Sequence, residues 1–236
     1  MKKIVFLTLG FMMLYGCNSP YSLGKFKKIL SVSKLQAPNS HYNPLYSTKY
    51  GEFEDFCNQY FTLQDNKYMA FFMCGKKHRS ELRFKNDWNV SDSNAHIIEA
   101  RVKLFPLNEK REFTFLQIHA DSTLKDKPVI DKPLLRIVWY KHLRGKKNHI
   151  WAVIRTCDNP NVMCYEKIDL GEMPKSFFDI KVEVKNSKLK IWVNGKLKVD
   201  KDVSYWNKFL NYFKAGVYLQ DEGCAKVLFD KLEIKE

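Results

Sequence analysis

Three short blocks of the sequence carry side chains that can bind charge or move a proton. They are RSELR at residues 79–83, QIH at 117–119 and YFKAGVYLQ at 212–220. In an extended strand, residues two positions apart point to the same side of the sheet. The first block therefore places Arg79, Glu81 and Arg83 on one face. The second block places Gln117 and His119 together.

The third block has two faces of opposite character. One face holds Tyr212, Lys214, Gly216, Tyr218 and Gln220, and the other holds Phe213, Ala215, Val217 and Leu219. A strand of this kind packs against a hydrophobic core with its apolar side and presents polar side chains on the other side. We therefore expect the three polar faces to line a substrate groove. Solvated strands with surface ion pairs would also explain each block taken alone.

Taken together, in this order and at these separations, the three blocks resemble the signature regions of the alginate lyases of polysaccharide lyase family 7. The resemblance spans residues 51–236. It implies an all-β jelly-roll sandwich of two antiparallel sheets with a concave substrate groove. It also implies that the chain cleaves the 4-O-glycosidic bonds of alginate by β-elimination, which leaves an unsaturated 4-deoxy uronate at the non-reducing end. Ile118, between Gln117 and His119, resembles family members that accept guluronate-containing blocks.

The resemblance also implies a catalytic role for four residues. Removal of the C5 proton adds negative charge beside the C6 carboxylate, so that carboxylate must first be neutralised. Arg79 and Gln117 are the implied donors to it. His119 is implied as the base that removes the C5 proton of guluronate, and Tyr218 as the acid that protonates O4. For mannuronate, the resemblance implies that Tyr218 serves both roles.

The remaining polar side chains of the blocks are predicted to bind neighbouring sugar units or to orient the catalytic groups. They are Glu81, Arg83, Tyr212, Lys214 and Gln220. This chemistry needs no metal or organic cofactor, and no ligand cluster in the sequence argues for one. The expected partner is alginate or a similar polyanionic polysaccharide, bound by a monomer.

The rest of the chain is rich in short segments of Val, Ile, Phe, Trp and Tyr, which predict strands. These segments are residues 68–73, 97–104, 113–118, 135–140, 150–155, 180–184, 189–193 and 227–234. Asn194-Gly195 is the strongest hairpin signal. The only helix-like segment is short, at residues 203–210. This pattern independently favours an antiparallel sandwich or jelly-roll.

The N-terminal segment is typical of an export signal. Three residues, Met1-Lys2-Lys3, precede a short apolar run at 4–15. The sequence LYGC at 14–17 resembles a lipobox, which implies removal of residues 1–16 and a lipid on Cys17. We then expect a flexible tether at 17–46 and one catalytic domain at 47–236, held at the outer membrane or cell surface. A secreted or periplasmic protein with an ordinary cleaved signal is the alternative.

The chain is strongly basic, with 40 Lys and Arg against 26 Asp and Glu and a formal charge of +14. Such a charge suits an acidic polysaccharide, but also nucleic acid or anionic lipid. Export and the absence of a nucleic-acid motif argue against nucleic acid. Two rivals remain: a non-catalytic lipoprotein that binds anionic carbohydrate, and a lyase for another polyuronate such as glucuronan.

The cysteine content also agrees with export, because disulfides persist in oxidising compartments. Cys157 and Cys164 bracket a turn-rich stretch, and we predict a disulfide between them. The sequence leaves the pairing of Cys57, Cys74 and Cys224 open; one alternative is a Cys57–Cys74 disulfide with Cys224 as a buried free thiol.

Overall fold

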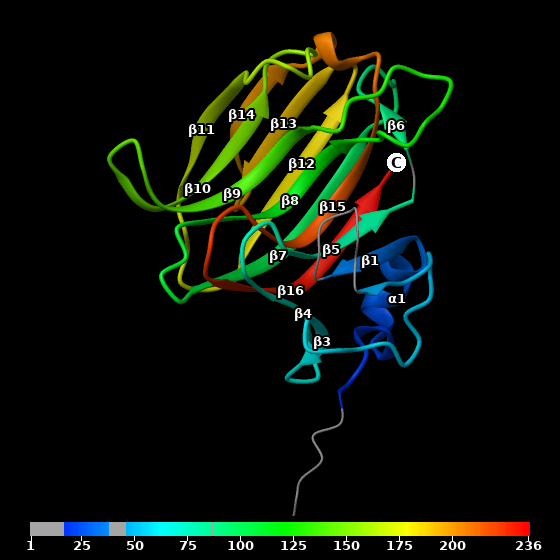
Figure 1. Ribbon diagram of the computed structural model, residues 1–236, viewed down its shortest axis with the longest axis vertical. Coiled ribbons are helices and arrows are strands. Elements are labelled where there is room, and N and C mark those ends of the chain that lie inside the picture. The colour runs from blue at the N-terminus through cyan, green and yellow to red at the C-terminus, as the bar shows by residue number, and fades with distance from the viewer. Residues whose placement is uncertain (1–16, 38–45, 86) are drawn as a thin grey trace, which may run out of the picture.

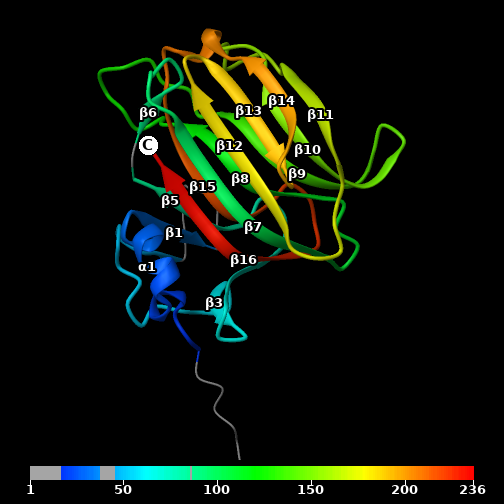
Figure 2. The same cartoon turned by 180° about the vertical axis from the view of Figure 1, so that it is seen from behind.

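The computed structural model describes residues 17–37, 46–85 and 87–236. The expected export signal at residues 1–16 lies outside the described residues. The chain forms two antiparallel sheets that lie one behind the other (Figure 1 and Figure 2). The predicted all-β jelly-roll sandwich is confirmed. In the described residues no helix is long and apolar enough to cross a membrane.

Sheet A has nine strands and sheet B has seven. In order of pairing, sheet A contains β11 (Tyr165–Glu172), β10 (Lys146–Arg155), β9 (Pro133–Leu143), β8 (Glu112–Ala120), β15 (Leu210–Leu219), β5 (Arg79–Phe84), β1 (Ser33–Ala37) and β2 (Tyr46–Ser47), with β6 (Trp88–Asn89) paired to β15. Sheet B contains β14 (Lys196–Asp202), β13 (Lys188–Val193), β12 (Phe178–Lys185), β7 (His96–Leu107), β16 (Cys224–Lys235), β4 (Tyr68–Cys74) and β3 (Phe61–Gln64).

Each predicted strand falls within a strand of the structure, and the Asn194-Gly195 turn joins β13 to β14. The helix-like segment at 203–210 is shorter than expected, because only η2 (Ser204–Trp206) is helical there.

The core lies between the two sheets and is built from alternating inward-facing side chains. The predicted apolar face of β15 is buried in it: Phe213, Ala215, Val217 and Leu219. The side chains that alternate with these point to the opposite side of sheet A. Sheet A therefore separates the core from the surface on which the polar blocks lie.

The tether predicted at 17–46 is wrong for the part of it that the structure describes. Residues 18–37 form η1 (Pro20–Ser22), α1 (Gly24–Ser31) and β1. The α1 side chains Phe26, Ile29 and Leu30 share the helical spacing of one buried face, and all three belong to the core. The intervening lysines obscured that spacing. The predicted domain boundary at residue 47 is wrong, and residues 38–45 lie outside the described residues.

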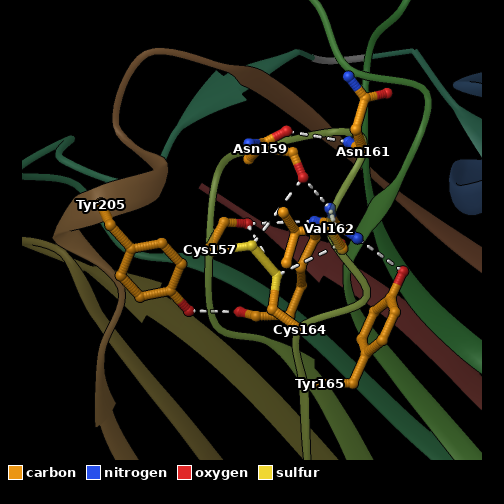
Figure 3. Close-up of a disulfide and its surroundings, with 8 residues drawn as sticks. Cys157, Asn159, Asn161, Val162, Cys164, Tyr165 and Tyr205 are labelled. Atoms are coloured by element: carbon orange, nitrogen blue, oxygen red, sulfur yellow. Dashed lines mark hydrogen bonds between the residues drawn. A yellow bond between two sulfur atoms is a disulfide. The ribbon is translucent and has the colours of Figure 1, made fainter.

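The predicted disulfide between Cys157 and Cys164 is present and closes the loop between β10 and β11 (Figure 3). The buried Arg155 side chain supports this loop from within. Its guanidinium donates to the carbonyl oxygens of Cys157 and Val162 at 3.1 and 2.8 Å, and to the Tyr165 hydroxyl at 2.9 Å. The loop is thus held both covalently and by hydrogen bonds to one buried cation.

The other cysteine predictions are wrong. Cys224 is no free thiol, because it is bonded to Cys74, its register partner across β4 and β16. Cys57 is bonded to Cys17 instead of Cys74. A thioether-linked lipid on Cys17 would need the same sulfur atom, so it could not coexist with the Cys17–Cys57 disulfide.

A substitution in α1 tests whether this segment belongs to the folded domain. Phe26 is fully buried, and Phe26→Ala should lower the free energy of unfolding by about 3–5 kcal/mol. Urea unfolding followed by tryptophan fluorescence measures the change. The exposed Lys28 provides the control, since Lys28→Ala should shift stability by less than about 0.5 kcal/mol. Equal stability of both variants would restore the tether interpretation.

Candidate active site

The polar faces of the three blocks meet on one side of sheet A. Strand β15 lies between β5 and β8, where its Tyr218 faces Arg79 and its Lys214 faces Gln117 as register partners (Figure 1). His119 lies two residues beyond Gln117 on the same side. The residues that alternate with them are buried in the core: Leu82, Ile118 and Val217. The structure therefore brings all four predicted catalytic residues to one surface, turned away from sheet B.

The Glu81 carboxylate holds these strands together from below that surface. Gln117 Nε2 donates to Glu81 Oε1 at 2.5 Å, and Lys214 Nζ lies 2.5 Å from Glu81 Oε2. Arg79 Nη1 lies 3.8 Å from the same Oε2. We call Glu81, Gln117, Lys214 and Arg79 the Glu81 network.

The predicted substrate-binding role of Glu81 and Lys214 does not fit this geometry. Their exposed fractions are 0% and 1%, so neither side chain can contact a sugar. Burial lowers the pKa of Lys214 to about 8, while the Glu81 carboxylate opposes that shift. An unpaired charge at this depth would be strongly unfavourable, so each side chain neutralises the other. The pair therefore orients the groups above it instead of binding sugar.

Arg79 and Gln117 retain donors that the protein does not use. Arg79 Nε is buried and has no hydrogen-bond partner among the described residues. The Gln117 amide carries two N–H donors, and the Glu81 carboxylate accepts from its nitrogen. The Arg79 guanidinium also lies 5.0 Å from the centre of the Tyr218 ring. The site thus presents planar donors beside a phenol, as carboxylate binding requires.

The His119 imidazole is held in a state that can accept a proton. Its Nδ1 lies 2.8 Å from the Ala120 carbonyl oxygen, which can only accept, so Nδ1 carries the hydrogen and Nε2 bears the lone pair. Asp131 Oδ1 lies 4.0 Å from Nε2. Burial lowers the pKa of His119 to about 4, and the Lys214 charge adds to this shift. At neutral pH the ring is therefore uncharged.

A stack of side chains sets the plane of the His119 ring. The Tyr212 ring lies against it, with centroids 5.6 Å apart and an interplanar angle of 23°. The Arg83 guanidinium lies over the Tyr212 ring, with Cζ 3.9 Å from the ring centre. Arg83 Nη2 in turn lies 2.7 Å from Asp121 Oδ2. Arg83 and Tyr212, predicted to bind sugar, thus also position the imidazole.

Sequence reasoning missed Asp121 as a member of this stack. Asp121 lies two residues after His119, just past the end of β8, and Thr123 donates to it as in an ordinary turn. The shared two-residue spacing with His119 was the signal that could have identified it.

Tyr218 differs from His119 in that its pKa is raised and not lowered. Burial raises its pKa, and the nearby Arg79 charge only partly opposes this, so the phenol stays protonated at neutral pH. A register shift of β15 against β8 places Tyr218 opposite Thr114. Gly216 lies within this shift at φ 144°, where a Cβ atom would clash with the Ser80 carbonyl oxygen. Beyond it, Gln220 donates to the Thr114 hydroxyl, so the predicted sugar-binding Gln220 is partly engaged by the protein.

Comparisons with known proteins agree with this site. The sequence model described as alginate lyase matches residues 29–236. An alginate lyase of Photobacterium sp. (strain ATCC 43367) is 32% identical over 248 residues, which cover 91% of this chain and 87% of the relative.

Solved structures show the same architecture. Alginate lyase AlyC3 has 29% identity and a TM-score of 0.81, covering 93% of this chain and 96% of its own. AlyC3 has also been solved with dimannuronate, with a TM-score of 0.82. Alginate lyase A1-II′ of polysaccharide lyase family 7 shares the fold, with 19% identity, a TM-score of 0.70 and coverage of 88% and 95% of the two chains. The family match along most of the sequence shows that the chain belongs to the alginate lyases of polysaccharide lyase family 7.

Proposed function

We propose that the chain cleaves alginate by β-elimination on the outer face of sheet A. The observation that carries this proposal is the pairing of an uncharged His119 with a protonated Tyr218 around the donors of the Glu81 network. A base and an acid whose surroundings favour opposite protonation states are what proton abstraction and leaving-group protonation need.

The reaction proceeds without water. Arg79 and Gln117 bind the C6 carboxylate and neutralise the charge that develops when C5 loses its proton. His119 Nε2 accepts that proton, the electron pair of the C5–H bond forms the C4=C5 double bond, and the C4–O4 bond breaks. The Tyr218 hydroxyl gives its proton to O4. The products are a free hydroxyl on one fragment and an unsaturated 4-deoxy uronate on the other.

We propose that guluronate-containing blocks are the better substrates. In guluronate the C5 proton and the O4 leaving group lie on opposite faces of the ring, which requires two separate groups. The raised pKa of Tyr218 supports this division, because a protonated phenol is a poor base. Ile118, which suggested the same preference, is buried and acts on no sugar directly.

Mannuronate cleavage is the second candidate. The structure of AlyC3 with dimannuronate, from a protein 29% identical to this chain, favours it. In that case Tyr218 would both remove the C5 proton and protonate O4, and nearby Arg79 would have to stabilise the phenolate.

An absorbance assay distinguishes these functions. The protein is incubated separately with polyguluronate and polymannuronate, while ultraviolet absorbance from the new C4=C5 bond is followed. We expect turnover of both and a higher kcat/KM on polyguluronate. A faster rate on polymannuronate would support the second candidate. Folded protein that binds alginate and forms no unsaturated product would mean a non-catalytic carbohydrate-binding protein.

Substitution of the acid and the base tests their roles in the same assay. His119→Ala and Tyr218→Phe should each lower kcat by at least about 100-fold, with melting temperatures close to that of the wild type. Matched controls are His142→Ala, at an exposed position of β9, and Tyr68→Phe on β4 of sheet B. Near-normal turnover by either active-site variant would contradict the assignment.

The pH profile tests the charge coupling between Lys214 and His119. His119 must be neutral to act, so kcat/KM should fall as pH decreases through its lowered pKa, below the 6.5 of an ordinary histidine. Because the Lys214 charge contributes to that lowering, Lys214→Met should raise the pKa and move the acidic limb to higher pH. The control is Lys190→Met on sheet B. An acidic limb that stays in place, measured by kinetics and by NMR titration of His119, would contradict the coupling.

We also propose that the protein is exported and acts as a monomer. The signal-like segment at 1–16 and the three disulfides support export, since disulfides persist mainly outside the cytoplasm. A lipid on Cys17 would hold the protein at the outer membrane or cell surface. One sulfur atom cannot form both a disulfide and a thioether, so this location is proposed only for molecules in which Cys17 is not bonded to Cys57.

A further inference from the structure

A row of six polar side chains, five of them cationic, crosses sheet A and continues beyond the predicted site residues. Its members are consecutive register partners or lie in line with them, one to a strand: Lys34 on β1, Arg83 on β5, Lys214 on β15, Gln117 on β8, Arg136 on β9 and, beyond one apolar residue on β10, Lys167 on β11. Register partners point to the same side of a sheet. With strands about 4.8 Å apart, the row spans about 29 Å. It therefore extends past the catalytic strands by one strand on the β1 side and by three on the β11 side.

The cations of the row differ in whether a carboxylate pairs with them. Lys214 pairs with Glu81, and Arg83 pairs with Asp121. In the part of the chain that the structure describes, no carboxylate oxygen lies within 4.0 Å of the Arg136 or Lys167 side-chain nitrogens. Both side chains are half-buried against aromatic rings: Arg136 Cζ lies 5.8 Å from the Tyr165 ring centre, and Lys167 Nζ lies 4.8 Å from that of Tyr140. Both cations are thus oriented by aromatic rings and have no carboxylate partner among the described residues.

The cluster beneath these two cations is apolar and buried. A small cluster, separate from the main core, lies on this outer face of β9 and β10 and comprises Val138, Tyr140, Trp151 and Val153, with Leu143 and Tyr165 packed against it. The indole N–H of Trp151 is buried and has no acceptor among the described residues. The exposed fractions of the cluster's four buried members are 0–7%, so the cluster supports the stems of Arg136 and Lys167 from beneath. The half-exposed cationic groups are what a sugar carboxylate would meet.

This surface adjoins the site described above. Arg136 is the register partner of Gln117, and its positive charge is among those that lower the pKa of the Tyr218 phenol. Lys167 lies two strands farther along the row, about 10 Å away. Each unit of a uronate polymer carries one carboxylate, so a chain that lies across the strands brings successive carboxylates along the row.

We propose that Arg136 and Lys167, above the apolar cluster of β9 and β10, form a subsite that binds the carboxylates of uronate units beyond the one that is cut. The polymer then lies across the strands, from the catalytic residues toward β11. This inference rests on the proposed function, since it takes the ligand to be a polyuronate. The subsite governs affinity for longer chains and takes no part in the chemical step.

Direct binding tests the subsite separately from catalysis. An alginate hexasaccharide is titrated by calorimetry into the His119→Ala/Tyr218→Phe protein, with and without Arg136→Met/Lys167→Met. Methionine keeps an apolar stem against Tyr165 and Tyr140 and removes only the charge. We expect the Kd to rise about tenfold or more, and the loss to shrink at high salt. The control is Lys190→Met/Lys181→Met on sheet B, which should bind as tightly as the parent.

The outcomes separate the two proposals. An unchanged Kd in the Arg136→Met/Lys167→Met protein would overturn the subsite, whether or not the wild type produces unsaturated product. Weaker binding would support it even if the absorbance assay failed to show elimination. Should the double variant unfold, Lys167→Met alone carries the test, because this half-exposed lysine supports no buried partner in the described structure. In active enzyme, the same substitution should raise KM for the polymer about threefold or more and leave kcat within about twofold.

Discussion

The active site depends on one buried carboxylate. Glu81 is fully enclosed, and a carboxylate at that depth is stable only if cations and donors replace the water it has lost. Lys214 supplies its contact from the neighbouring strand β15, Gln117 from β8 one strand farther, and Arg79 approaches from the same strand as Glu81. Removing one member of such a buried pair typically costs about 3–5 kcal/mol. The pairing therefore sets both the register of β5, β15 and β8 and the direction of the donors they carry.

Burial also divides the proton chemistry between two residues. The same desolvation that lowers the pKa of a histidine raises that of a tyrosine, because in each case it disfavours the charged form. At neutral pH His119 is therefore an unprotonated base and Tyr218 a protonated acid, and burial is the main cause of both states. The Tyr212 and Arg83 stack then fixes the imidazole plane, and Asp121 holds Arg83. Donors, base and acid are all in place before substrate arrives, which is the condition for electrostatic stabilisation of the transition state.

Much of this arrangement could be predicted from the sequence because alternation along a strand is a local property. The two faces of residues 212–220 are visible in the letters alone, and the structure places them as predicted. Depth was not visible: alternation assigns Glu81 and Lys214 to the polar face but cannot say that both lie beneath it. The proposed role of Arg136 could not be predicted either, because only the strand register shows that this arginine lies beside Gln117. Helix α1 and the Cys74–Cys224 disulfide likewise depend on long-range packing.

The most direct test of the account is a crystal structure of the His119→Ala/Tyr218→Phe protein with an alginate tetrasaccharide. One sugar carboxylate should lie within hydrogen-bond distance of both the Arg79 guanidinium and the Gln117 amide, with C5 facing position 119 and O4 facing position 218. The Glu81 contacts to Lys214 and Gln117 should remain as they are here. A sugar bound with its carboxylate away from Arg79 and Gln117 would contradict the account.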